Sequence, residues 1–207
     1  CLLRVSWVDP ESVRVAPDLP HGIRATYRPR TPRLVVTRGG EAIALLASDG
    51  MVLPPGFDET LLARFLAVPL ESGAILPEPG MRVSDSLHQE ALAAVEEALW
   101  VRDTLKVPIV RIARRFDFPR SASGVPPALS FVCEDGREIC WGWSVASERR
   151  VDAPDEVRIS LERKADRLRK IVKAHPQLDG LSRVIVDRAQ VSLRDLDGAW
   201  VEPPPGL

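Results

Sequence analysis

Histidine and cysteine side chains most often do chemistry in proteins, and this chain has only three of each. His21, His88 and His175 lie far apart, and none forms a metal-ligand motif with a cysteine, an aspartate or a second histidine. The sequence also lacks phosphate-binding glycine loops, H-E-x-x-H, C-x-x-C and G-x-S-x-G. We therefore predict no catalytic residues, no metal and no cofactor.

Two of the cysteines flank Asp135-Gly136, a strong hairpin signal. A two-residue turn there pairs Cys133 with Glu138 and places Cys140 opposite Phe131. The two sulfur atoms are then diagonal neighbours on one face, which is farther apart than a disulfide bond allows. We interpret both cysteines as core thiols, and redox chemistry is the alternative.

Trp141-Gly142-Trp143 follows in the same strand and could offer aromatic rings to a carbohydrate. Strand alternation places both rings on one face together with Ile139, which is more typical of a core. A glycine between them would let another segment pack closely on the opposite face. The alternative is an envelope ligand-binding protein or an enzyme that uses Cys140, Trp141 and Trp143.

The carboxylate pairs Glu96-Glu97 and Asp155-Glu156 fall on exposed positions of the expected helices, where we interpret them as solvated. No nucleophile has a base at a recognisable spacing, so the sequence favours a protein that is not an enzyme.

Composition excludes other classes. The 207 residues are 45% hydrophobic and 28% charged, which is typical of a globular protein. The formal charge of −1, although 24 of the 28 cations are arginine, excludes a strong overall attraction for nucleic acid. No apolar run approaches the ~18 residues that a membrane helix requires. The 19 prolines are scattered, which predicts a fold of short elements.

The first third of the chain predicts a β-meander. Alternating apolar and polar residues predict two half-buried strands around Val13–Val15 and Ile23–Tyr27. Leu34–Val36 and Ala42–Leu46 flank Gly39-Gly40 as a hairpin, and Met51–Leu53 makes a further short strand.

Helices are expected in three places. Asp58 can cap a short helix that includes Leu61, Leu62, Phe65 and Leu66 and ends at Pro69. Ser86 and Gln89 fit a capping box for a long helix that runs to about Thr104, with an apolar stripe of Leu87, Ala91, Val95, Ala98 and Leu99. Ser160 can cap a second long helix that ends at His175-Pro176, with Leu161, Ala165, Leu168, Ile171 and Val172 on its apolar face and Arg, Lys and Glu on the other.

The remaining strands are expected at 109–112, 129–134, 137–143, 184–186 and 191–196, with a loop over 114–127. The fold class predicted is α+β: a mainly antiparallel or mixed β-sheet with two long helices and a shorter one.

Read in order, these segments resemble the extracytoplasmic region of the bacterial cell-division family FtsQ/DivIB. The motif at the end of the family's POTRA domain, a Pro-Trp-Val followed later by a Glu-Arg-x-Pro segment, is similar to Ser6-Trp7-Val8 and to Arg30 with Pro32. Later motifs are similar to Asp49-Gly50, to Asp135-Gly136 with Gly142, and to Lys164 with Leu168, Ile171 and Val172. The family's "DLRY.nG.AV" resembles Ser192-Leu193-Arg194-Asp195-Leu196-Asp197-Gly198-Ala199-Trp200-Val201. Ser6, Ser192 and Asp195 depart from the family's usual Pro, Asp and Tyr.

The resemblance implies three regions: the last strands of a truncated POTRA-like domain at 1–33, the family's β domain at 34–202, and a Pro-rich tail at 203–207. It also implies further POTRA sequence and a single membrane anchor upstream, which fits a chain that starts at Cys1 within an apparent strand (Leu2, Leu3, Val5, Trp7). The implied function is a noncatalytic divisome scaffold on the periplasmic side of the cytoplasmic membrane, which recruits FtsB-like and FtsL-like partners for septal peptidoglycan synthesis. Another alternative is a β-rich envelope adaptor unrelated to division, which would differ from this scaffold only in its partner.

The partner is expected to bind by β-strand addition, because Val191–Val201 is the last strand before the Pro-rich tail and no later segment could cover its edge. Arg194 and Leu196 would face the partner or solvent, and Leu193 would anchor the strand to the core. A protected edge, with Arg194 and Asp195 as deterrent charges, is the alternative. The predicted partner-binding residues are Val191, Leu193, Arg194, Asp195, Leu196 and Trp200.

Overall fold

The computed structural model describes residues 6–18, 20–54, 59–116, 126–148 and 159–207. Several predictions fall outside these residues: the strand positions Leu2, Leu3 and Val5, the Asp58 cap, and the pair Asp155-Glu156. The chain divides into two compact units, Cys1–Phe65 with Pro69–Asp85 and Leu66–Val68 with Ser86–Leu207. We call these the first and the second unit.

The first unit contains the predicted meander. β3 (Pro32–Arg38) and β4 (Glu41–Ala47) form an antiparallel hairpin around Gly39-Gly40, and β5 (Val52–Leu53) pairs with β4. Their inward side chains form a cluster of Val35, Leu45, Ala47 and Leu53, against which Trp7, Met51, Leu62 and Phe65 pack. Burial of these apolar side chains is the main source of stability for the unit.

Arg30 connects two segments of the first unit that both belong to the motifs of the resemblance. Its Nη1 donates to the backbone oxygens of Ser6 at 2.8 Å and Val8 at 2.5 Å, and its Nε lies 3.0 Å from the Asp49 carboxylate. The Arg30 side chain is almost fully buried, at 8% exposure, so this arrangement holds the Trp7 segment beside the turn before β5.

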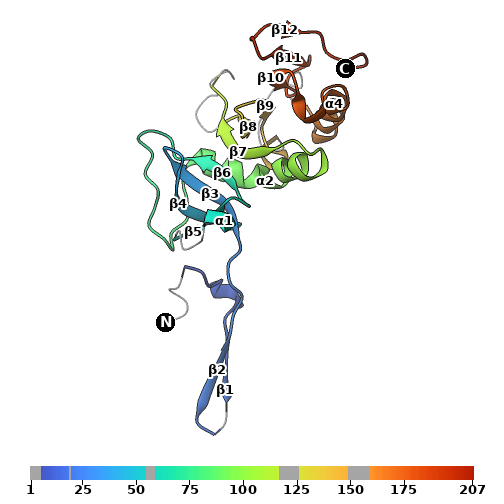
Figure 1. The fold of residues 1–207 in the computed structure, drawn as a ribbon. Helices are drawn as coiled ribbons and strands as arrows, with labels where there is room; N and C mark the ends of the chain where they lie inside the picture. Colours follow the sequence, from blue (N-terminus) through green and yellow to red (C-terminus); the bar gives the residue numbers. More distant parts are fainter. Residues whose placement is uncertain (1–5, 19, 55–58, 117–125, 149–158) are drawn as a thin grey trace. The chain divides into compact units, whose positions relative to one another are not determined.

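The short 3₁₀ helix η2 (Pro10–Ser12) leads into β1 (Arg14–Asp18) and β2 (Gly22–Thr26), which form a two-stranded ribbon (Figure 1). The prediction of half-buried strands is wrong here, because every residue of β1 and β2 is exposed, Ile23 to 78%. The alternation exists, since Val15, Pro17, Ile23 and Ala25 share one face. Among the described residues, however, no segment packs on that face.

The second unit is built on a mixed sheet with the strand order β12-β11-β10-β9-β8-β7-β6. The β10–β9 and β6–β7 pairs are parallel and the other neighbours are antiparallel. The strands are β6 (Leu66–Pro69), β7 (Ile109–Arg114), β8 (Leu129–Cys133), β9 (Glu138–Gly142), β10 (Leu181–Ile185), β11 (Ser192–Asp195) and β12 (Trp200–Val201). With two long helices in the same unit, the predicted α+β class is confirmed.

The first long helix, α2 (Ser86–Thr104), packs on β7 and β8 through the predicted apolar stripe, including Leu87, Ala91, Val95 and Ala98 (Figure 1). The second, α4 (Leu161–Ala174), begins as predicted at Ser160, whose Oγ accepts from the Arg163 amide at 3.3 Å, and ends at His175. The one-turn helix α3 (Val145–Glu148) follows β9 directly, and η4 (Pro176–Leu178) follows α4. Within the described ranges, no helix combines the length and the apolar character that a membrane span needs.

The predicted helix through Leu66 is wrong. The helix α1 spans only Glu59–Leu62, and Leu66–Pro69 forms β6, which pairs with β7 through Ala67 and Arg111. Leu66 and Val68 are fully buried on a short strand, so tertiary pairing outweighs the local helical pattern.

The β8–β9 hairpin exists, but its predicted register is wrong by one residue. The Cys133 amide donates to the Arg137 oxygen at 2.8 Å, so the loop has three residues, with Gly136 at a φ of +88°. Cys140 therefore lies opposite Ser130, and Cys133 and Cys140 point to opposite faces of the sheet. Both are buried free thiols, as predicted. The reason differs from the predicted one: the two sulfur atoms are kept apart because they lie on opposite faces of the sheet, and not because they are diagonal neighbours on one face.

Candidate functional site

The predicted partner-binding segment is not one strand but a hairpin at the edge of the sheet. β11 covers Ser192–Asp195, a turn follows at Asp197-Gly198, and β12 pairs back onto β11 through Leu193–Val201 and Arg194–Trp200. The expectation that no later segment could cover the edge of β11 is thus wrong. The edge belongs instead to β12, the terminal strand in the order of this sheet.

Asp195, a predicted partner contact, builds the turn of this hairpin. Its Oδ1 accepts from the Asp197 amide at 3.0 Å and from the Ala199 amide at 2.8 Å. Its own amide donates to the Ala199 oxygen at 3.0 Å, and Gly198 adopts a φ of +82°. An aspartate is suited to this role because its short side chain can bond to nearby backbone amides.

The other five predicted residues divide into a buried and an exposed group. Leu193 is fully buried between Val184 of β10 and Val201 of β12, and Val191 is also buried. Of the remaining three, Leu196 is 71% exposed in the turn and Trp200 is 61% exposed, while Arg194 is half-buried with its guanidinium 4.3 Å from the centre of the Trp200 ring. The structure therefore brings Arg194 and Trp200 together, while Val191 and Leu193 anchor the hairpin.

The backbone of β12 has one side available for a new strand. The Asp195 amide bonds to Ala199, and the next inward-bonding pair along an antiparallel ladder is Leu193–Val201. The N–H and C=O of Trp200 lie between these pairs and therefore point away from β11. These are the groups that an added strand would bind.

The alternative site around Cys140, Trp141 and Trp143 lies beneath the surface. All three residues are buried, and the Trp141 ring stacks on Phe131 at 5.0 Å between centroids. Burial raises the pKa of the Cys140 thiol to about 11, so the thiol is poorly reactive at neutral pH. The prediction that these residues are buried in the core is confirmed.

Gly142 makes the predicted close approach. It has a φ of +83°, and a Cβ placed there would lie 2.9 Å from both the Cβ and Oδ2 of Asp187. Asp187 is held from its other side by Arg115, whose Nη1 lies 2.6 Å from each carboxylate oxygen. Both side chains are at most 3% exposed, so this is a buried ion pair.

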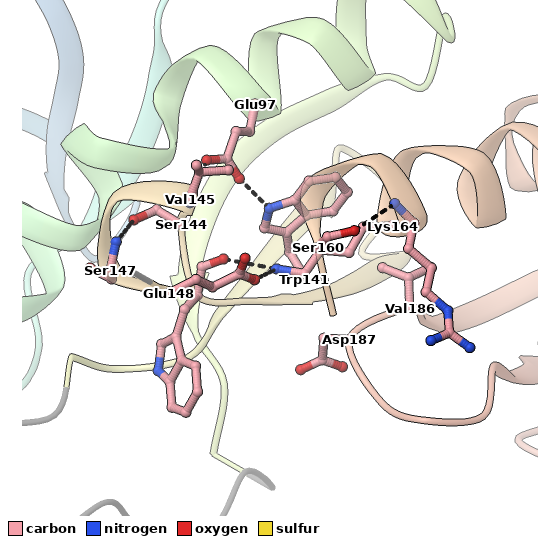
Figure 2. Close-up of polar contacts among 12 residues, drawn as sticks. Glu97, Trp141, Ser144, Val145, Ser147, Glu148, Ser160, Lys164, Val186 and Asp187 are labelled. Carbon is pink, nitrogen blue, oxygen red and sulfur yellow. Dashed lines mark hydrogen bonds and ion pairs between the residues drawn. The ribbon is translucent and has the colours of Figure 1, made fainter. Parts of the chain in front are cut away.

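A network of polar groups surrounds Trp141 in the second unit and was not predicted from the sequence (Figure 2). From α2, Glu97 accepts from the Trp141 indole N–H at 2.5 Å and from the Val145 amide at 2.9 Å. Glu90 accepts from the Ser144 amide at 2.6 Å and also binds the Ser147 hydroxyl. The two carboxylates therefore satisfy amides at the start of α3, as a cap residue would. The prediction that Glu97 is solvated is wrong, and burial raises its pKa above the ordinary value.

Two cations of α4 are also buried, although the Arg, Lys and Glu residues of that helix were predicted on the face opposite the apolar one. Lys164, 1% exposed, donates to the Trp143 oxygen at 3.0 Å and pairs with Glu148 (Figure 2). Arg167, 5% exposed, donates to three backbone oxygens in the β10–β11 loop. A signal existed in the sequence, because Lys164 lies within the stripe of Leu161, Leu168 and Ile171, and Glu90 lies within the stripe of Leu87, Ala91 and Ala94.

Within the described residues, the carboxylates of this network bind backbone amides, a hydroxyl, an indole and a cation of the same unit. Within the ranges that the structure describes, no three His, Cys, Asp or Glu side chains gather as a metal site would require. Among the described residues, the β11–β12 hairpin combines an outward-pointing backbone N–H and C=O, at Trp200, with the exposed side chains of Leu196 and Trp200. No model of a known protein family matches the sequence, and no curated protein does.

Proposed function

We propose that this chain is a noncatalytic interaction module of the FtsQ/DivIB type, which acts as a divisome scaffold on the periplasmic side of the cytoplasmic membrane. The support is the resemblance of five sequence motifs in the family's order, together with an α+β fold that has a sheet edge at the last of these motifs. The partners proposed are FtsB-like and FtsL-like proteins, and septal peptidoglycan synthesis is the process supported.

The observation that carries the proposal is the geometry of β12. It is the terminal strand of its sheet, and the Trp200 N–H and C=O point away from β11. An extended partner segment can bind there through backbone hydrogen bonds, while the exposed Trp200 ring and Leu196 supply apolar contact area beside it.

The short length of β12 also limits nonspecific strand pairing at this edge of the sheet. β12 has only two residues, and Pro203-Pro204-Pro205 follow closely, so a long ladder cannot form. Specific binding must then depend on the side chains next to the edge, in particular Arg194 and Trp200. A short strand with an exposed aromatic side chain therefore favours binding of one specific partner over nonspecific aggregation.

The competing function, a ligand site or an enzyme at Cys140, Trp141 and Trp143, is less well supported. A carbohydrate platform needs exposed ring faces, and both rings are buried, Trp141 fully. A reactive thiol needs a lowered pKa, and that of Cys140 is raised.

The test is a pair of variants at one position. Trp200→Ala removes the ring and retains the outward N–H, whereas Trp200→Pro removes both. We expect Trp200→Ala to weaken binding of an FtsB–FtsL complex, and Trp200→Pro to weaken it by a further factor of about 5–10, as the loss of one backbone hydrogen bond predicts. Binding is measured by titration in solution, with circular dichroism to verify the fold of each variant.

Glu202→Ala is the control, because it changes an exposed side chain beside β12 and retains every backbone donor. Equal binding by Trp200→Ala and Trp200→Pro would show that strand addition does not occur at this edge. Leu196→Pro is a poorer probe, since Leu196 lies in the turn and not in either strand.

A further inference from the structure

The loop between β10 and β11, residues 186–191, is held by contacts with three other parts of the second unit. From α4, Arg167 Nη1 donates to the Val186 oxygen at 2.8 Å and the Arg188 oxygen at 2.5 Å, and its Nη2 donates to the Ala189 oxygen at 2.8 Å. A single buried guanidinium thus satisfies carbonyl groups along half of the loop.

The same loop has a second anchor on its other side. Asp187 is paired with Arg115, which follows β7, and lies against Gly142 at the end of β9. The Val186 amide also donates to the Cys140 oxygen at 3.3 Å. The loop therefore cannot shift along the sheet without breaking contacts to α4, β9 and the segment after β7.

The position of this loop decides the register of β11. Ile185 and Ser192 are paired directly across it, and β11 has only four residues. A slip of one residue would turn Leu193 out of the core and bring Arg194 into it. Because β11 and β12 contribute few buried side chains of their own, their pairing alone specifies the register weakly.

We propose that Arg167 is a positioning residue for the β12 edge: by holding the carbonyl groups of residues 186, 188 and 189, it sets the register of β11 and hence the orientation of Arg194 and Trp200. This inference rests on the proposed function only in taking that edge as the binding surface.

The guanidinium group is required for this role because it is planar and carries several N–H donors in a fixed arrangement. A lysine at the same position would retain the charge and could still reach some of these oxygens, but it cannot hold three in fixed geometry. Arg167→Lys is therefore expected to be intermediate between the native protein and Arg167→Ala.

The experiment is hydrogen exchange of the whole chain without any partner, compared among the native protein, Arg167→Ala and Arg167→Lys. We expect Arg167→Ala to speed exchange of the amides of residues 192 and 194, which face β10, by about tenfold or more, with a much smaller effect on β8 and β9. Arg163→Ala is the matched control, since it makes the same substitution at an exposed position one turn earlier on α4.

Uniform acceleration across β8, β9 and β11 would overturn the inference, because Arg167 would then serve only general stability. No acceleration in β11 would also overturn it. Should Arg167→Ala not fold, Arg167→Lys carries the same comparison. Since no partner is present, the result is independent of the Trp200 experiment: localised exchange with unaltered binding in the Trp200 variants would retain the positioning role and refute the proposed function.

Discussion

At the scale of single residues, buried charge is the unusual property of the second unit. Glu90, Glu97 and Lys164 lie on the helices α2 and α4 among apolar neighbours, and Glu148 ends α3. Moving such groups out of water is costly, and replacing a buried ion pair by apolar residues is often neutral or stabilising. We therefore attribute to this network a role in specifying where α3 and α4 dock on β9, and not a large net gain in stability.

Glu97 gives this network a measurable pH dependence. Its pKa is raised, first by desolvation, while the hydrogen bonds from Val145 and Trp141 and the charge of Lys164 act in the opposite direction. A carboxyl group whose pKa is higher in the folded protein binds a proton more tightly there, so its protonation favours folding. Its destabilising effect is present at neutral pH and is relieved as the pH falls through the raised pKa.

We expect the free energy of unfolding of the native protein to rise relative to that of Glu97→Gln as the pH is lowered from 7 to 5. The measurement is urea unfolding of both proteins at several pH values. Comparing the two proteins cancels the contributions of the other carboxyl groups. A difference that falls on acidification would mean that hydrogen bonding, and not burial, dominates the environment of Glu97.

At the scale of elements, the end of β9 requires a glycine at position 142 for two reasons. Gly142 needs a left-handed backbone, and the Asp187 side chain fills the space where a Cβ would lie. Gly136 in the β8–β9 loop has the same kind of backbone, with a φ of +88°, but nothing lies within 4 Å of a Cβ placed there. The two positions therefore separate the backbone requirement from the packing requirement.

Gly136→Ala is expected to cost roughly 1–2 kcal/mol of stability, the cost of the left-handed conformation alone. Gly142→Ala should cost about 1–3 kcal/mol more, because overpacking against Asp187 is added. Thermal unfolding of the two variants measures the difference. Equal losses would show that Asp187 moves aside and that the close approach is not important for the fold.

At the scale of the whole molecule, the β1–β2 ribbon contributes to neither core. Its apolar face is exposed, Val15 to 65%, and isolated two-stranded ribbons are marginally stable in water. By contrast, Val35 on β3 is 4% exposed and lies in the cluster of the first unit. Identical substitutions at these two valines should therefore have very different consequences.

Val15→Thr should alter stability by less than about 0.5 kcal/mol, as expected for an exposed position. Val35→Thr places a hydroxyl group in an apolar cluster and should cost about 1–3 kcal/mol. The midpoint of urea unfolding reports both effects. A large loss for Val15→Thr would reveal that the apolar face of the ribbon is covered in solution.

The sequence alone determined the local elements with strong periodicity or clear turn chemistry. The Gly39-Gly40 and Asp135-Gly136 hairpins, the stripe of α2 and the Ser160 cap of α4 all depend on neighbouring residues, and each is present. The close approach at Gly142 was also predictable, because only glycine permits it. Of the candidate site, the anchoring role of Leu193 and the exposure of Leu196 followed from alternation and position.

Tertiary structure decided what depends on distant partners. Leu66–Pro69 is a strand because β7 is available to pair with it, and Val15 and Ile23 are exposed because no described segment covers them. Lys164 is buried and Glu97 half-buried because the amides, carbonyls and opposite charges that satisfy them come from other elements. The edge strand of the sheet is β12 and not β11, and β12 has only two residues, which are too few to give a periodic pattern in the sequence. A sequence pattern reports the preference of a segment, whereas pairing and burial are properties of two segments together, and only the folded chain brings them into contact.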